Sequence, residues 1–245
     1  MKITFIGTGH GVPSAERSTS STMITTGGVN YYVDAGAPIS ERTMKLGYKV
    51  EDAKAIFATH SHGDHIAGLY QFLDLYNWRY RDSEIEVYLP EERVRLALTE
   101  LLSATTRDVD TTRLHISTYE KDTVYDDGNL RASFNPTAHM AVINRPSYGV
   151  LIEAEGKRIY FSGDLSQKLE ANDFPFEMLN GIDLFVCELA HFTIADIGKH
   201  LSSIGAKRVA FNHVYPLEKY DELEALKGKY PFEILTPSDM EEIEI

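Results

Sequence analysis

The chain has 245 residues, enough for one sizeable hydrophobic core, so we expect a single domain over residues 1–245, with two small domains less favoured. Apolar residues make up 43% and charged residues 25% of the chain, which is ordinary for a globular protein and excludes a disordered one. The net charge of −13 disfavours non-specific nucleic-acid binding, because a phosphate backbone attracts surfaces rich in lysine and arginine.

The cysteine count and the hydropathy of the sequence indicate the cellular compartment of the protein. Cys187 is the only cysteine, so no intramolecular disulfide can form, and its apolar surroundings predict a buried core thiol. No segment approaches the roughly 18 apolar residues that a membrane span needs. The apolar run in MKITFIGTGH is too short for a signal peptide. We therefore expect a cytoplasmic protein without a membrane partner.

In the first half of the chain, short β-branched and aromatic runs alternate with helical patterns. Strands are predicted at Lys2–Gly7, Val29–Gly36, Ala53–His60 and Glu84–Pro90, and helices at Ile66–Tyr80 and Glu91–Ala104. This alternation is typical of βα units.

The second half adds hairpins to the βα units. Two hairpins are predicted, Asp122–His139 turning at Asp127-Gly128 and Ser147–Asp164 turning at Glu155-Gly156. After them we expect a strand at Ile182–Leu189, a helix at Thr193–Gly205, a strand at Lys207–His213, an acidic helix and a final strand. Hairpins mixed with βα units predict two mixed sheets packed face to face, with helices outside.

The segment Ala58–Gly68, ATHSHGDHIAG, concentrates three of the nine histidines within one turn. His60 and His62 alternate in an extended segment, so their imidazoles point the same way. Gly63 lets the chain bend, which places Asp64 and His65 at the start of the next helix. Imidazole and carboxylate together are ligands of zinc above all, with manganese or iron as alternatives.

Three further polar residues each follow an apolar strand: His139, Asp164 and His213. Loops that follow strands gather at the edge where a site forms. With the cluster they supply seven ligands, enough for two divalent ions that share a carboxylate.

The ordered motif His60-x-His62-x-Asp64-His65, followed by the three later residues, resembles the metallo-β-lactamase superfamily. That family has an α/β (α+β) fold, an αββα sandwich with the metals at one sheet edge. The resemblance implies two ions, one held by His60, His62 and His139, the other by Asp64, His65 and His213, with Asp164 between them.

Two segments indicate a branch of the superfamily. Gly7–Ser21 is similar to the opening of ribonuclease Z and its related phosphodiesterases, and Cys187–Pro216 is similar to the segment that holds a glutamate and a His-x-Thr. This likeness implies that His191 stabilises the transition state or protonates the leaving group, that Glu188 orients His191, and that Asp64 orients the attacking water. A carboxylate at Asp164 favours phosphodiesterases, lactonases and thioester hydrolases over β-lactamases.

The chain departs from ribonuclease Z where that family grips tRNA. Its substrate loop has Ala15 and Ser18 in place of a lysine and an asparagine, although Pro13 and Arg17 remain. Only 24 residues separate His139 from Asp164, too few for a tRNA-gripping arm. We expect a small phosphodiester rather than nucleic acid, with His10 and Arg17 as substrate contacts.

Two other functions remain open. The same centre could open a lactone or a thioester, or the protein could be a non-catalytic metal-binding module without an open coordination position. The aromatic stretch Tyr70–Tyr80 leaves a homodimer contact open as well.

Overall fold

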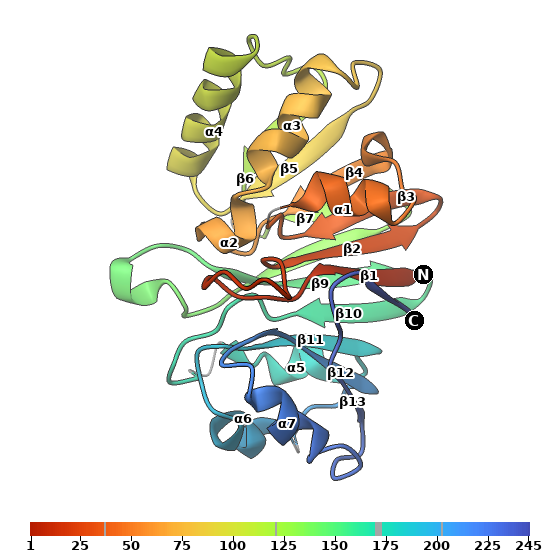
Figure 1. Cartoon of the computed structure of the whole chain (residues 1–245), viewed down its shortest axis with the longest axis vertical. Coiled ribbons are helices and arrows are strands. Elements are labelled where there is room, and N and C mark those ends of the chain that lie inside the picture. Colours follow the sequence, from red (N-terminus) through yellow and green to blue (C-terminus); the bar gives the residue numbers. More distant parts are fainter. Residues whose placement is uncertain (37, 121, 170–172, 202) are drawn as a thin grey trace.

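Two β-sheets packed face to face form the centre of the molecule (Figure 1). The structure is a computed structural model that describes residues 1–36, 38–120, 122–169, 173–201 and 203–245. Within these residues the first sheet has the strand order β14–β1–β2–β3–β4–β5–β6 and the second the order β13–β12–β11–β10–β9–β8–β7. The first sheet consists of β1 (Lys2–Gly7), β2 (Ser21–Thr26), β3 (Val29–Val33), β4 (Ala53–Phe57), β5 (Ile85–Leu89), β6 (Leu114–Thr118) and β14 (Glu241–Glu244). The second consists of β7 (Val124–Asp126), β8 (Arg131–Pro136), β9 (Tyr148–Ala154), β10 (Lys157–Phe161), β11 (Leu184–Leu189), β12 (Arg208–Val214) and β13 (Glu233–Leu235).

Both sheets are mixed, as the sequence predicted. The pairs from β14 to β3 are antiparallel and those from β3 to β6 are parallel. In the second sheet the pairs from β7 to β10 are antiparallel and those from β10 to β13 are parallel. Antiparallel pairs therefore build one half of each sheet, and parallel pairs, which need crossover connections, build the other half.

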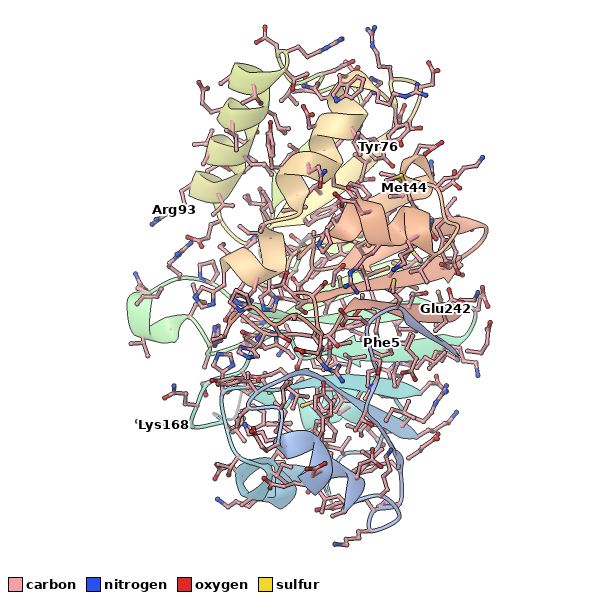
Figure 2. All side chains as sticks on the ribbon, in the orientation of Figure 1. Phe5, Met44, Tyr76, Arg93, Lys168 and Glu242 are labelled. Atoms are coloured by element: carbon pink, nitrogen blue, oxygen red, sulfur yellow. The ribbon has the colours of Figure 1, made fainter. Side chains whose placement is uncertain are left out.

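Helices cover the outer face of each sheet. They are α1 (Ile39–Lys45), α2 (Gly63–Ile66), α3 (Leu69–Trp78), α4 (Glu92–Thr105), α5 (Phe176–Leu179), α6 (Ile194–Leu201) and α7 (Lys219–Glu224), with 3₁₀ turns η1 (Val50–Asp52) and η2 (Ala141–Ile143). Figure 2 shows Phe5 in the layer between the sheets, whereas Tyr76 of α3 lies in the outer layer above the first sheet. The predicted αββα sandwich is confirmed.

Strand β11 shows how the sequence builds these layers. Leu184 and Val186 belong to the core between the sheets, while Phe185, Cys187 and Leu189 belong to the core under the outer helices. Alternate residues of a strand point to opposite faces, so a strand that is apolar throughout is buried on both. Cys187 is the buried thiol that the sequence predicted.

Several details differ from the sequence-based expectation, among them helices α1 and α5, which the sequence did not predict. The helix predicted at Ile66–Tyr80 begins instead at Leu69 as α3, because α2 ends at Ile66 and the N–H of Gly68 donates to Ala35 O at 2.8 Å. The sequence did not predict β2, where polar residues are buried on both faces, or β6, which is short and half exposed. The sequence predicted one final strand, but the structure has two, β13 and β14, in different sheets. Strand β14 pairs with β1 and brings the chain ends close together (Figure 1). Helix α6 ends at Leu201, whereas the helix was predicted to continue to Gly205. Residue 202 of that predicted helix lies outside the described residues.

The parallel halves of the sheets decide where side chains gather. The loops that follow β4, β11 and β12 leave the carboxyl ends of parallel strands, where ligand sites of α/β sheets form. No helix in the part of the chain that the structure describes has the length and apolarity needed to cross a membrane.

Candidate metal centre

The His60–His65 segment forms the turn between β4 and α2. The strand ends at Phe57, three residues before the predicted end at His60. Helix α2 begins at Gly63, so Asp64 and His65 lie at the start of a helix, as the sequence predicted. His60 and His65 are buried, with 0% and 1% of their surface exposed. The segment therefore carries imidazoles from the end of a core strand into the interior.

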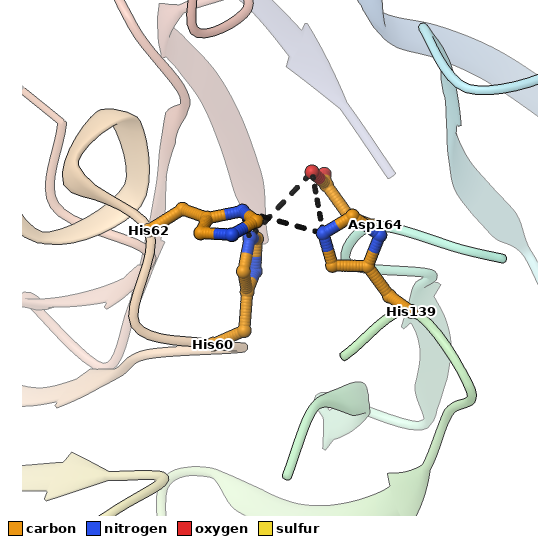
Figure 3. A group of neighbouring side chains, drawn as sticks. All are labelled: His60, His62, His139 and Asp164. Atoms are coloured by element: carbon orange, nitrogen blue, oxygen red, sulfur yellow. Dashed lines mark hydrogen bonds and ion pairs between the residues drawn. The ribbon is translucent and has the colours of Figure 1, made fainter. Parts of the chain in front are cut away.

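Three histidines and a carboxylate form the first group of ligand atoms (Figure 3). Nδ1 of His62 lies 3.0 Å from Nε2 of His60 and 3.3 Å from Nε2 of His139. Oδ2 of Asp164 lies 3.5 Å from Nε2 of His60 and 3.7 Å from Nε2 of His139. Ligands about 2.1 Å from a tetrahedral ion are roughly 3.4 Å apart, so these spacings fit a single divalent ion.

The second group consists of Asp64, His65 and His213. Oδ2 of Asp64 lies 3.5 Å from Nε2 of His65 and 3.7 Å from Nε2 of His213. Asp164 faces this group too, 3.3 Å from His65 and 3.4 Å from His213. The structure thus brings all seven predicted ligands together, with Asp164 between the two groups.

Two buried atoms in this centre make no hydrogen bond within the described residues. They are Nε2 of His65 and Oδ1 of Asp164, which face each other at 3.3 Å. A buried polar atom without a partner is costly, and coordination to a cation removes that cost. The donor set and these two atoms therefore fit divalent metal ions.

Contacts at the far side of three of the rings fix the ligand atom. Nδ1 of His139 donates to Leu165 O and Nδ1 of His213 donates to Gly9 O, both at 3.2 Å. Nδ1 of His65 donates to Asp34 at 2.7 Å. Because these oxygens can only accept, the hydrogen stays on Nδ1 and Nε2 is the ligand atom. The Gly7–Ser21 segment thus supports His213 through Gly9.

The electrostatics of the centre agree with metal ligation. Burial lowers the pKa of His60 and of His139, so both imidazoles are neutral, as ligation requires. Burial raises the pKa of Asp164, but the neighbouring His213, His65 and His60 outweigh it and hold that pKa well below its usual range. Burial lowers the pKa of His65, but the neighbouring Asp164 and Asp34 outweigh it and raise that pKa well above its usual range. The buried ionised carboxylate of Asp164 therefore attracts positive charge to the centre.

A family model described as Anti-Pycsar protein Apyc1 matches residues 1–195. The chain belongs to this family.

Relatives and solved structures place the Apyc1-family chain in the ribonuclease Z-like branch of the metallo-β-lactamase superfamily, as the sequence predicted. A ribonuclease Z of Exiguobacterium sp. is 29% identical over 174 residues, which cover 69% of this chain and 54% of the relative. The short form of human tRNase Z matches with a TM-score of 0.78 at 20% identity, over 100% of this chain and 99% of its own. YhfI from Bacillus subtilis, a metallo-β-lactamase fold protein, matches with a TM-score of 0.78 at 19% identity, over 99% and 98%. The chain spans about half the length of the curated relatives it matches, 54% of the first and 63% of a second from Mycobacterium marinum.

Glu188 and His191 form a pair at the rim of the Apyc1-family centre. Nδ1 of His191 donates to Oε1 of Glu188 at 2.9 Å, and its Nε2 lies 3.8 Å from Oδ2 of Asp164. Glu188 also accepts from the N–H of Leu165 at 2.9 Å and of Ala190 at 2.6 Å. Burial lowers the pKa of His191, but the hydrogen bond to Glu188 outweighs it and raises the pKa to about 9. Glu188 therefore orients a histidine that carries a proton at neutral pH.

The two expected substrate contacts occupy different surroundings. The His10 ring lies 3.9 Å from the Tyr215 ring and 6.1 Å from the His213 ring, measured between centroids. The Arg17 guanidinium donates to Thr8 Oγ1 and to Pro237 O, and it lies over the Tyr220 ring at 4.3 Å. Both line one cavity, and their contact with substrate stays a prediction.

Asp34, which the sequence did not predict, supports His65 from outside the ligand set. Its Oδ1 also accepts from N and Oγ1 of Thr59, at 2.7 and 3.0 Å. The signal was present in VNYYVDAG, where a carboxylate follows a strand as Asp164 does.

Proposed function

We propose that this protein is a metal-dependent hydrolase that cleaves a small phosphodiester with two divalent ions, zinc above all. The observation that carries the proposal is the central position of Asp164, whose carboxylate lies 3.3–3.8 Å from Nε2 of five histidines. Two ions that share one carboxylate would supply Lewis acidity, lowering the pKa of water and offsetting negative charge on phosphoryl oxygens.

The protein's own residues divide the remaining work. Asp64 faces the second group and would orient the attacking water. His191 would donate its proton to the departing alkoxide, since its raised pKa keeps it protonated at neutral pH. Glu188 would keep the imidazole aimed at the centre through the bond to Nδ1.

The surroundings of the centre support a small substrate. A cavity of about 380 Å³ is lined by His10, Val12, Tyr215 and Leu217. Gly11, between His10 and Val12, approaches the second group of ligands, since a Cβ built on it would lie 3.2 Å from Oδ2 of Asp64. Small-molecule pockets have volumes of roughly 300–1,000 Å³. The short connection between His139 and Asp164 and the net charge of −13 both disfavour a large polyanion such as tRNA.

A substrate panel tests the proposal. Protein loaded with zinc or manganese is expected to hydrolyse bis(p-nitrophenyl) phosphate, dinucleotides or cyclic mononucleotides faster than precursor tRNA, acyl-homoserine lactones or thioesters. Elemental analysis should find two ions per chain, and Asp164→Asn should lose the paired ions. Faster opening of a lactone or thioester, or no turnover of any substrate by the loaded protein, would overturn the proposal.

A further inference from the structure

A carboxylate outside the ligand set contacts two ligand-bearing segments. Glu91 directly precedes α4, and 7% of its side chain is exposed. Its Oε1 accepts from Oγ of Ser61 at 2.8 Å. Nε of Arg145 donates to Oε1 at 2.8 Å and to Oε2 at 3.0 Å, and the NH2 nitrogen of Arg145 lies 2.6 Å from Oε1. We call these three residues, Ser61, Glu91 and Arg145, the Glu91 clamp.

The clamp joins the segments that supply the first group of ligands. Ser61 stands between His60 and His62, and Arg145 lies on the loop that follows His139. The two segments are far apart in the chain, since His62 and His139 are separated by 77 positions, yet their ring nitrogens lie 3.3 Å apart. The backbone joins them once through Tyr148 N, which donates to Thr59 O at 2.9 Å, and Glu91 joins them a second time through side chains.

The chemistry of the clamp suits a rigid link. A guanidinium that donates several hydrogen bonds to one carboxylate is held in a fixed orientation relative to that carboxylate. Such a charge-assisted contact is stronger than a hydrogen bond between neutral groups. Burial raises the pKa of Glu91, but hydrogen bonds from Arg145 and Ser61 outweigh it and hold that pKa below its usual value. The carboxylate is therefore charged at neutral pH, and both partners are largely withdrawn from water, which would otherwise screen them.

We propose that Ser61, Glu91 and Arg145 are positioning residues that set the spacing between the His60–His62 turn and His139, and thereby the affinity of this half of the centre for its ion. The inference rests on the proposed two-ion site. None of the three residues belongs to either group of ligands, and they act through the ligands that they hold in place.

Stepwise metal affinity provides the test. Zinc dissociation constants of the full chain are measured by competition with a chromogenic chelator for Arg145→Gln, Arg145→Lys and Ser61→Ala, together with thermal unfolding of the metal-free proteins. Arg42→Gln is the matched control, because Arg42 and Asp239 form a pair with 21% and 8% of their side chains exposed, against 23% and 7% for Arg145 and Glu91. Arg42 reaches Ile6 O and Asp239 and joins no two ligand-bearing segments.

The clamp predicts a selective effect. Arg145→Gln should weaken one of the two binding steps about 10- to 100-fold, the usual effect of losing a partner outside the ligand shell, and leave the other step unchanged. Arg145→Lys should recover part of the affinity, because it keeps the charge but loses the planar fork. Ser61→Ala should weaken the same step less. Because this variant leaves the ion pair between Arg145 and Glu91 intact, it provides the test if Arg145→Gln does not fold.

Two outcomes would overturn the positioning role of the clamp. In the first, folded Ser61→Ala and Arg145→Gln bind zinc with wild-type affinity at both steps. In the second, both steps are weakened equally and Arg42→Gln shows the same weakening. These results are distinguishable from failure of the proposed function. Wild-type protein that binds two ions but hydrolyses no phosphodiester would overturn the function and leave the clamp standing.

Discussion

Nδ1 of His65 lies 2.7 Å from Oδ2 of Asp34, and both side chains are buried. Asp34 has a φ of 62°, a left-handed backbone that few residues other than glycine adopt. It sits where β3 ends, and its carboxylate contacts both Thr59 and His65. The pair therefore ties the end of one strand to a proposed ligand that follows the neighbouring strand.

Asp34→Asn is expected to weaken metal binding at the group formed by Asp64, His65 and His213. Asparagine keeps the shape but loses the charge that fixes the His65 ring, so the dissociation constant for that ion should rise about 10- to 100-fold. Competition with a chelator measures it. Asp127→Asn is the control, because Asp127 accepts from Tyr31 at 2.6 Å and Tyr125 at 3.0 Å away from the centre. Unchanged affinity in Asp34→Asn would contradict the supporting role.

Gly163→Ala is expected to reduce both stability and metal affinity. Gly163 precedes Asp164 with a φ of 58°, and a Cβ there would lie 2.5 Å from Tyr148 O and 2.9 Å from Cβ of Thr59. A left-handed alanine alone costs about 1–2 kcal/mol, and the clash with fixed backbone adds to it. Urea unfolding of the metal-free protein measures the loss. Gly128→Ala isolates the backbone cost, because Gly128 has a φ of 86° and no neighbour within 4 Å of an added Cβ. Equal losses in the two variants would show that the close approach at Gly163 does not matter.

Lys219→Met is expected to impair His191 without touching the metal ligands. Nζ of Lys219 donates to Leu189 O at 2.9 Å and to Phe192 O at 2.6 Å, so α7 holds the loop that carries His191. Methionine keeps most of the side-chain length and removes both bonds. Metal content should stay at the wild-type value, while kcat falls for phosphodiesters with poor leaving groups and KM changes little. Lys207→Met is a control, since Nζ of Lys207 bonds to Asp183, the residue before β11, at 2.7 Å. A Lys219→Met enzyme with wild-type kcat would exclude this anchoring role.

The ligand candidates were predictable because each carries a local signal. Asp164 and His139 follow strands whose apolar pattern is visible in the sequence, and the His60–His65 motif is compact enough to recognise alone. The layers followed from the same patterns, since β11 is apolar on both faces. Short strands such as β6 lacked this signal, because only one of its five residues is fully buried.

The residues around the ligands were less predictable because tertiary packing alone brings them together. Glu91 and Arg145 are 54 positions apart, and neither lies in a recognisable motif. Arg17 was predicted to contact substrate from its place in the Gly7–Ser21 segment, and this stays a prediction. The sequence did not indicate that its guanidinium also bonds to Thr8 and Pro237. Sequence pattern identifies chemistry at strand ends, but it does not identify the partners that orient it.

His191→Ala is expected to separate acid catalysis from metal binding. Nε2 of His191 lies 3.8 Å from Oδ2 of Asp164, close enough to face a leaving group at the centre. If His191 donates the proton, its loss should slow an alkyl phosphodiester about 10²- to 10⁴-fold, because an alkoxide leaves poorly without protonation. A p-nitrophenyl ester should be much less affected, since p-nitrophenolate needs no proton to depart. His115→Ala, at an exposed position on β6, should leave both rates unchanged. Equal rates for the alkyl substrate in His191→Ala and wild type would exclude the acid role. Loss of one ion from His191→Ala would instead make His191 a ligand, grouped with Asp164 and His213.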